Sequence, residues 1–120
     1  MNVRNLQRAS IEELVREYEQ AAAAHGQALT AGDSRSANRA HDRVATAYRE
    51  LRNRAVAHHL LPLLSSEDKN VRLWVAAHAL EFAPEQGEPC LLELAARPSL
   101  LRTRAEHTLK AWREGTLKFP

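Results

Sequence analysis

The sequence predicts an all-α fold of about six helices. Apolar residues recur every three or four positions along most of the 120 residues, which is the spacing of one helix face. No stretch alternates apolar and polar residues in the way a half-buried strand does. Residues typical of helix starts and stops stand between the periodic segments. These three observations favour helices packed against one another.

Ser10 and Glu13 form a capping-box motif that predicts the start of the first helix. Gly32 offers a left-handed stop for this helix, and Asp33 or Ser34 can cap the next. Glu17 falls on the solvent side together with most of the other charged residues. The predicted buried stripe consists of Ile11, Leu14, Val15, Tyr18, Ala22, His25 and Leu29.

The second helix is predicted over about residues 35–55, antiparallel to the first. Pro62 predicts a kink or a late start in the next element, residues 56–64, because proline lacks an amide donor. Asp68 caps a fourth helix over residues 69–83. The second helix turns inward Ala37, Ala40, Val44, Ala47, Tyr48, Leu51 and Ala55.

The fourth helix is apolar on nearly every side, so we expect it to be the most enclosed. Its only plausible solvent-facing edge contains Trp74, Ala77, His78 and Glu81. Gly87 and Pro89 are expected to open a short fifth helix that ends at Ala96. Pro98 and Ser99 are expected to start a sixth helix that stops at Gly115, with residues 116–120 as a loose tail.

The length and composition are those of one domain over residues 1–120, with an ordered core over about 10–114. The single cysteine, Cys90, cannot form an internal disulfide, which favours a cytoplasmic location. The longest apolar run, Leu60–Leu64, is far shorter than the ~20 residues that span a bilayer, so no membrane association is expected. Net charge alternates between acidic segments, 1–33 and 67–96, and basic segments, 34–66 and 97–120.

Residues 61–79 and 91–109 resemble each other weakly at an offset of 30, which is a period that helical solenoids use. These motifs resemble HEAT or armadillo-type repeats and a family of small, uncharacterised bacterial HEAT-like proteins. The resemblance covers about residues 10–112. It is carried by Leu61-Pro62-Leu63-Leu64, Asp68, Val71-Arg72 and Ala76, with Asn38-Arg39, Asp42-Arg43 and Glu50-Leu51 upstream.

The resemblance implies a right-handed, HEAT/armadillo-like stack of antiparallel helix pairs. It implies no activity and no catalytic residue, because that family has none established. Arg72 resembles the arginine that ties neighbouring HEAT units through acidic side chains, and Asp68 lies one turn away.

No motif predicts catalysis, a metal site or a cofactor. No two of the six histidines have the spacing of three or four that places two ligands on one helix face. Cys90 precedes two leucines, so a buried apolar role is expected for it. There is also no glycine-rich phosphate loop and no nucleophile elbow. We therefore do not expect an enzyme.

Arginines give the only functional signal. Arg35, Arg39 and Arg43 follow one another every four residues and predict a basic ridge, and a second basic element surrounds Arg102 and Arg104. We expect a protein partner, with an adaptor, inhibitor or immunity-type role. The alternative is a nucleic acid whose phosphates follow the ridge. The predicted interaction surface comprises Arg35, Arg39, Arg43, Trp74, His78, Arg102 and Arg104.

Overall fold

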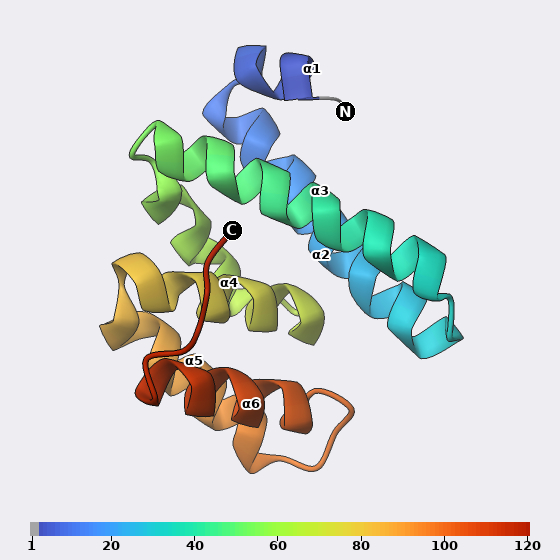
Figure 1. The fold of residues 1–120 in the computed structure, drawn as a ribbon, viewed down its shortest axis with the longest axis vertical. Helices are drawn as coiled ribbons and strands as arrows, with labels where there is room; N and C mark the ends of the chain where they lie inside the picture. The colour runs from blue at the N-terminus through green and yellow to red at the C-terminus, as the bar shows by residue number, and fades with distance from the viewer. Residues whose placement is uncertain (1–2) are drawn as a thin grey trace. The chain divides into compact units, whose positions relative to one another are not determined.

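The computed structural model describes the backbone of residues 3–120 and the side chains from Asn5 onward, and it confirms the all-α fold (Figure 1). This part of the chain contains seven helical segments and no strand. They are α1 (Val3–Arg8), α2 (Ile11–Ala31), α3 (Ser34–Asn53), the 3-10 helix η1 (Ala57–Ser65), α4 (Lys69–Phe82), α5 (Pro84–Ala96) and α6 (Arg102–Arg113).

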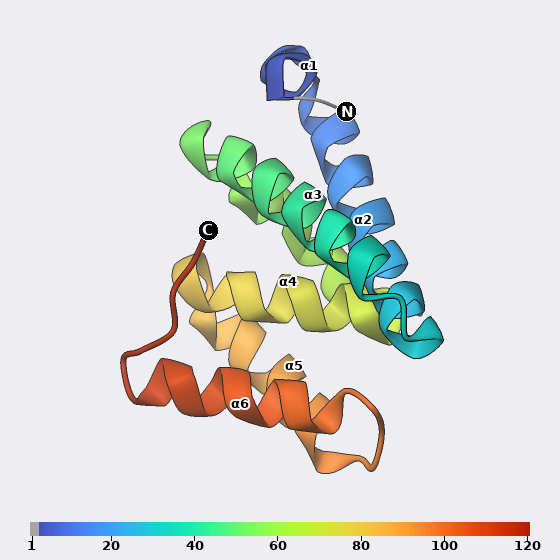
Figure 2. The ribbon, with the colours of Figure 1, turned by 45° about the vertical axis from the view of Figure 1, so that its right-hand side comes forward.

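Contacts within the chain divide it into two compact units. Unit 1 comprises the chain up to Leu60 together with Pro120, and unit 2 comprises Leu61–Phe119. Each unit contains one antiparallel helix pair as its main contact: α2 with α3 in unit 1, and α4 with α5 in unit 2 (Figure 2). The single domain expected from the sequence stays a prediction.

Side-chain caps fix the ends of the α2–α3 hairpin as predicted. The Glu13 amide donates to Ser10 Oγ at 3.1 Å, and the Ser10 amide donates to Glu13 Oε1 at 3.2 Å. Gly32 ends α2 with φ 71°, a left-handed conformation that glycine adopts without steric cost. Asp33 then caps α3 by accepting from the Ser36 amide at 3.0 Å. The predicted hairpin is thereby confirmed.

Small side chains line both helices of this hairpin. Alanines are buried along α2 and α3, and Tyr18 and Tyr48 are wholly buried beside them. Two predicted positions on α2 are wrong, however: Leu29 is 47% exposed, and Glu17 is buried. The apolar stripe is therefore rotated toward Glu17. The buried alanines are Ala21, Ala22, Ala28, Ala37, Ala40, Ala45 and Ala47.

Arg54 attaches α1 to the end of α3. Its guanidinium donates to the carbonyl oxygens of Ala9 at 2.7 Å, Leu6 at 2.9 Å and Gln7 at 3.0 Å. Helices end with carbonyls that lack intrahelical partners, and Arg54 supplies donors to them. The sequence did not predict α1, because six residues are too short to show a periodic apolar face.

The segment between α3 and α4 is irregular, as Pro62 predicts. It forms the 3-10 helix η1, with Pro62 inside it. Ala55 precedes η1 with φ 59°, which is uncommon for a residue other than glycine.

Unit 2 is built around a leucine-rich core shared by α4, α5 and α6. Helix α5 begins at Pro84 rather than at the predicted Gly87, because proline's fixed φ suits the first helical position. Likewise α6 begins at Arg102, three residues after Ser99. The buried core residues are Leu73, Ala76, Leu80, Leu91, Leu94, Leu101, Ala105 and Leu109.

The last five residues are not helical, but they do not form the expected loose tail. Leu117 and Phe119 are partly buried against the unit 2 core. The amides of Thr116 and Leu117 both donate to the Ala111 carbonyl, at 2.8 and 3.1 Å. These bonds fix a turn in the chain at the end of α6.

Gly87 sets the distance between α4 and α5. A Cβ atom at this position would lie 2.6 Å from the Ala76 carbonyl oxygen, which belongs to the backbone of α4. The glycine that sequence reasoning assigned to a helix start is therefore a contact residue within α5. Only glycine allows the two backbones to approach this closely.

We expect Gly87→Ala to lower the free energy of unfolding by about 1–3 kcal/mol, because the added methyl group overpacks the contact with α4. This loss should appear although alanine gains about 1 kcal/mol of helix propensity over glycine. Urea denaturation measures the change. The neighbouring exposed residue provides a control: Gln86→Ala should change stability by less than ~0.5 kcal/mol. Equal stability of Gly87→Ala and wild type would contradict the close approach.

Candidate interaction surface

The predicted arginine ridge on α3 loses one of its three members to an internal bond. Arg43 Nε donates to Glu17 Oε2, and Arg43 Nη2 donates to Glu17 Oε1, both at 2.9 Å. The Glu17 side chain is only 9% exposed. This bidentate bond raises the pKa of Arg43 above its ordinary value. Arg43 thus ties α3 to α2, and its guanidinium is occupied within unit 1.

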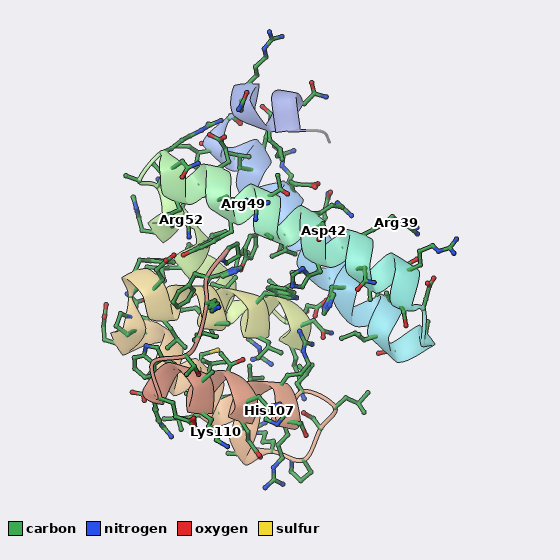
Figure 3. All side chains as sticks on the ribbon, in the orientation of Figure 1. Arg39, Asp42, Arg49, Arg52, His107 and Lys110 are labelled. Carbon is green, nitrogen blue, oxygen red and sulfur yellow. The ribbon has the colours of Figure 1, made fainter. Side chains whose placement is uncertain are left out.

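Three other arginines share the outer face of α3. Arg35, Arg39 and Arg49 lie within about 80° of one another around the helix axis and span about 21 Å along it. All three are exposed, and Figure 3 labels Arg39 and Arg49 on this helix. We call Arg35, Arg39 and Arg49 the α3 arginine row. Arg35 and Arg39 belong to the ridge predicted from the sequence, whereas Arg49 lies outside its spacing of four.

The α3 arginine row has no carboxylate partner within salt-bridge distance among the residues that the structure describes. Arg39 Nη2 donates to Ser36 Oγ at 2.9 Å, and Arg49 Nη2 donates to Thr46 Oγ1 at 3.3 Å. Both hydroxyl groups belong to α3 itself. These bonds orient two guanidinium groups, and Arg39 also has a longer-range electrostatic interaction with Asp33.

Asp42 interrupts this face. It is exposed between Arg39 and Arg49 (Figure 3), and the His41 ring nitrogen lies 3.8 Å from its carboxylate. The face is therefore basic but mixed. A continuous phosphate backbone would meet one acidic group midway along it.

The predicted edge of Trp74 and His78 on α4 is wrong for His78, which is only 4% exposed. Trp74 is half-buried, and its ring centroid lies 5.7 Å from that of His78. Only Lys69 and Glu81 of α4 are exposed, so this helix has no continuous solvent-facing edge. His78 therefore cannot belong to a surface for a partner.

In the second basic element, on α6, one of the two predicted arginines is exposed and the other is half-buried. Arg102 is exposed, and its Nε lies 2.8 Å from Glu106 Oε1. Arg104 is half-buried, and its Nη1 is buried and has no hydrogen-bond partner among the residues that the structure describes. Desolvation lowers the pKa of Arg104. Arg102 can meet a partner, whereas much of Arg104 is covered.

Arg72 does not form the expected tie to Asp68. The Asp68 carboxylate accepts from the amides of Asn70 and Val71, at 2.8 and 3.4 Å, and so caps α4. Arg72 Nε is buried and has no hydrogen-bond partner among the described residues. The Asp68 carboxylate, which was expected to pair with Arg72, therefore caps the N-terminus of α4 instead.

Cys90 lies beside Arg72 in a small pocket of 210 Å³ that Pro89, Glu93 and Leu94 also line. Burial is the main cause that raises the pKa of the Cys90 thiol. The thiol is therefore protonated at neutral pH, which disfavours it as a nucleophile. No group of three or more potential metal ligands occurs among the residues described.

A shallow groove of 670 Å³ runs between α5 and α6 in unit 2. Leu92, Ala95 and Ala96 line it on α5, and charged side chains of α6 line the opposite side. Leu92 is 45% exposed. Sequence periodicity could not reveal this groove, because Leu92 follows the buried Leu91 and reads as part of the same apolar segment.

Comparison with protein-family models, with curated proteins and with solved structures gives no match. The HEAT-like assignment therefore stays a prediction from the sequence. In the part of the chain with a described structure, no helix combines the length and apolar character needed to cross a membrane.

The Glu17–Arg43 pair predicts unequal effects of two arginine substitutions on α3. Arg43→Ala should destabilise the protein by about 1–3 kcal/mol, because it leaves the buried Glu17 carboxylate without its donors. Arg39→Ala, which removes an exposed side chain one turn away, should change stability by less than ~0.5 kcal/mol. Thermal or urea unfolding of both variants measures the difference. If the two losses were equal, the pair would not hold α2 and α3 together.

Proposed function

We propose that this chain is a non-enzymatic interaction module that binds an acidic surface of a protein partner through the α3 arginine row. One observation carries the proposal: three exposed arginines on one face of a long helix have no carboxylate within salt-bridge distance among the described residues. Arginine is enriched at protein interfaces and at their energetic hot spots. Its planar guanidinium also matches a carboxylate in a bidentate geometry.

The scaffold beneath the row supports this proposal. Helix α3 is capped by Asp33 and joined to α2 by Arg43 and the buried alanines. A partner would therefore meet guanidinium groups on an ordered helix, and binding would cost little ordering of the backbone. In keeping with the sequence resemblance, we propose an adaptor, inhibitor or immunity-type role in the cytoplasm.

Nucleic acid is the second candidate, because exposed arginines along one face of a helix can also follow phosphates. Three observations weigh against it. Asp42 lies within the row, and Arg43 is already bound to Glu17. The outer face of α3 also carries no aromatic side chain on which a base could stack. An acidic protein surface fits the mixed face better.

The triple variant Arg35→Ala, Arg39→Ala, Arg49→Ala tests the proposal. Immobilised wild-type protein should capture a partner from extract of the source cell, and the variant should capture it at least ~10-fold less well. The control removes three exposed arginines elsewhere: Arg8→Ala, Arg16→Ala, Arg97→Ala. Both variants lose the same charge, so equal capture by both would remove the α3 arginine row as the site.

Fluorescence anisotropy with labelled duplex and single-stranded oligonucleotides separates the two candidates. We expect no binding at ~50 mM salt, where phosphate contacts are strong. Binding that weakens steeply with salt, and less steeply in the α3 triple variant, would replace the protein partner by a nucleic acid.

A further inference from the structure

The exposed face of α6 carries four charged residues at successive helical turns. Arg102, Glu106, Lys110 and Glu114 follow one another every four residues, and all four are exposed. Glu114 follows the last helical residue but keeps helical φ and ψ angles. The four therefore form one row along the helix, which we call the α6 charge row. Lys110 is labelled on this face in Figure 3.

When the α6 charge row is placed against an antiparallel copy of itself, every basic residue meets an acidic one. From the N-terminus the order is basic, acidic, basic, acidic. In an antiparallel copy related by a two-fold axis midway between Glu106 and Lys110, Arg102 faces Glu114 and Glu106 faces Lys110. Each of these contacts occurs twice, because a two-fold interface repeats every pair. Four contacts between opposite charges result, and none between like charges.

The two ion pairs that the α6 charge row forms within its own helix are weak. Arg102 Nε lies 2.8 Å from Glu106 Oε1, and Lys110 Nζ lies 3.9 Å from Glu114 Oε1. In both pairs the basic residue precedes the acidic one, which is the less favourable order for a spacing of four. Such exposed pairs contribute little to stability. The charged groups therefore remain available to a second helix.

Apolar surface lies next to the α6 charge row. Glu106, Lys110 and Glu114 form one side of the groove whose other side is Leu92, Ala95 and Ala96 of α5. Leu92 is 45% exposed, and Leu100, in the connection between α5 and α6, is 82% exposed. Three large apolar side chains are exposed on the described part of the chain, and Leu92 and Leu100 are two of them. An occupant of the groove would remove apolar surface from water.

We propose that the α6 charge row and the adjoining groove bind a second copy of this chain, with the two α6 helices antiparallel. Rows at a spacing of four pack side by side when two helices cross at about −50°, the commonest helix packing geometry. The reversed charge order makes a second copy the matching occupant, because the same row supplies both partners of every pair. This interface lies in unit 2 and does not involve the α3 arginine row.

One helix and one groove bury a modest area, so we expect a weak dimer that dissociates on dilution and in salt. Sedimentation equilibrium from about 10 µM to about 1 mM protein should show a monomer–dimer equilibrium. Raising the salt from ~50 to ~500 mM should weaken it, since exposed charges are then screened. A monomer throughout this range at low salt would overturn the proposal.

Two opposite charge reversals test the pairing itself. Glu106→Lys places a second ammonium group against Lys110 of the other copy, and Lys110→Glu places two carboxylates together. Each variant alone should associate at least ~10-fold more weakly than wild type. An equimolar mixture of the two variants should dimerise again, because every cross-chain pair is then of opposite charge. A mixture that stays monomeric would contradict the antiparallel register.

Glu67→Lys and Lys69→Glu are matched controls, because they are exposed and change the net charge by the same amounts. Each should dimerise like wild type. If they weakened the dimer as much as the α6 variants, net charge rather than the α6 charge row would control association, and the proposal would fail. These results do not depend on capture of another protein, so this proposal and the proposed function can fail separately.

Discussion

Close approach between paired helices is the constraint on which each unit depends. In unit 2 it rests on one residue, since the α5 backbone at Gly87 leaves no room for a Cβ against the Ala76 carbonyl. In unit 1 buried alanines serve the same purpose along α2 and α3. Few large aromatic residues are available to fill wide gaps, as aromatic residues make up only 5% of the chain. The alanine-lined contact in unit 1 is dense only if α2 and α3 lie close together.

Electrostatics then determines which charged groups remain for binding. Glu17 binds Arg43, and Glu50 binds Arg54 at 2.9 Å, so two of the basic residues of unit 1 hold the structure together. Arg8, Arg16 and the α3 arginine row keep no carboxylate within salt-bridge distance among the described residues, and only the row gathers three of them on one face of one helix. The same distinction applies to α6, where Arg104 is half-buried and Arg102 is exposed. A count of arginines on a helix therefore overstates the surface that a partner can meet.

Sequence reasoning predicted the elements whose signals are local. The capping box at Ser10, the stop at Gly32 and the cap at Asp68 are all confirmed. It failed where a distant residue decides the outcome. Gly87 reads as a helix breaker until α4 lies against it, and nothing near Arg43 in the sequence shows that Glu17 is its partner. Arg35 and Arg39 were correctly expected to be exposed, whereas the burial of His78 depends on the packing of α4.

The attachment of α1 through Arg54 has a consequence for how this end of the chain can evolve. Three of the four groups that accept from the guanidinium are backbone carbonyls, which every amino acid provides. Leu6 and Ala9 are buried, while Gln7 and Arg8 are exposed. Substitutions at the exposed positions leave the attachment intact. The exposed positions of α1 can therefore change without loss of the attachment, provided that Arg54 is kept.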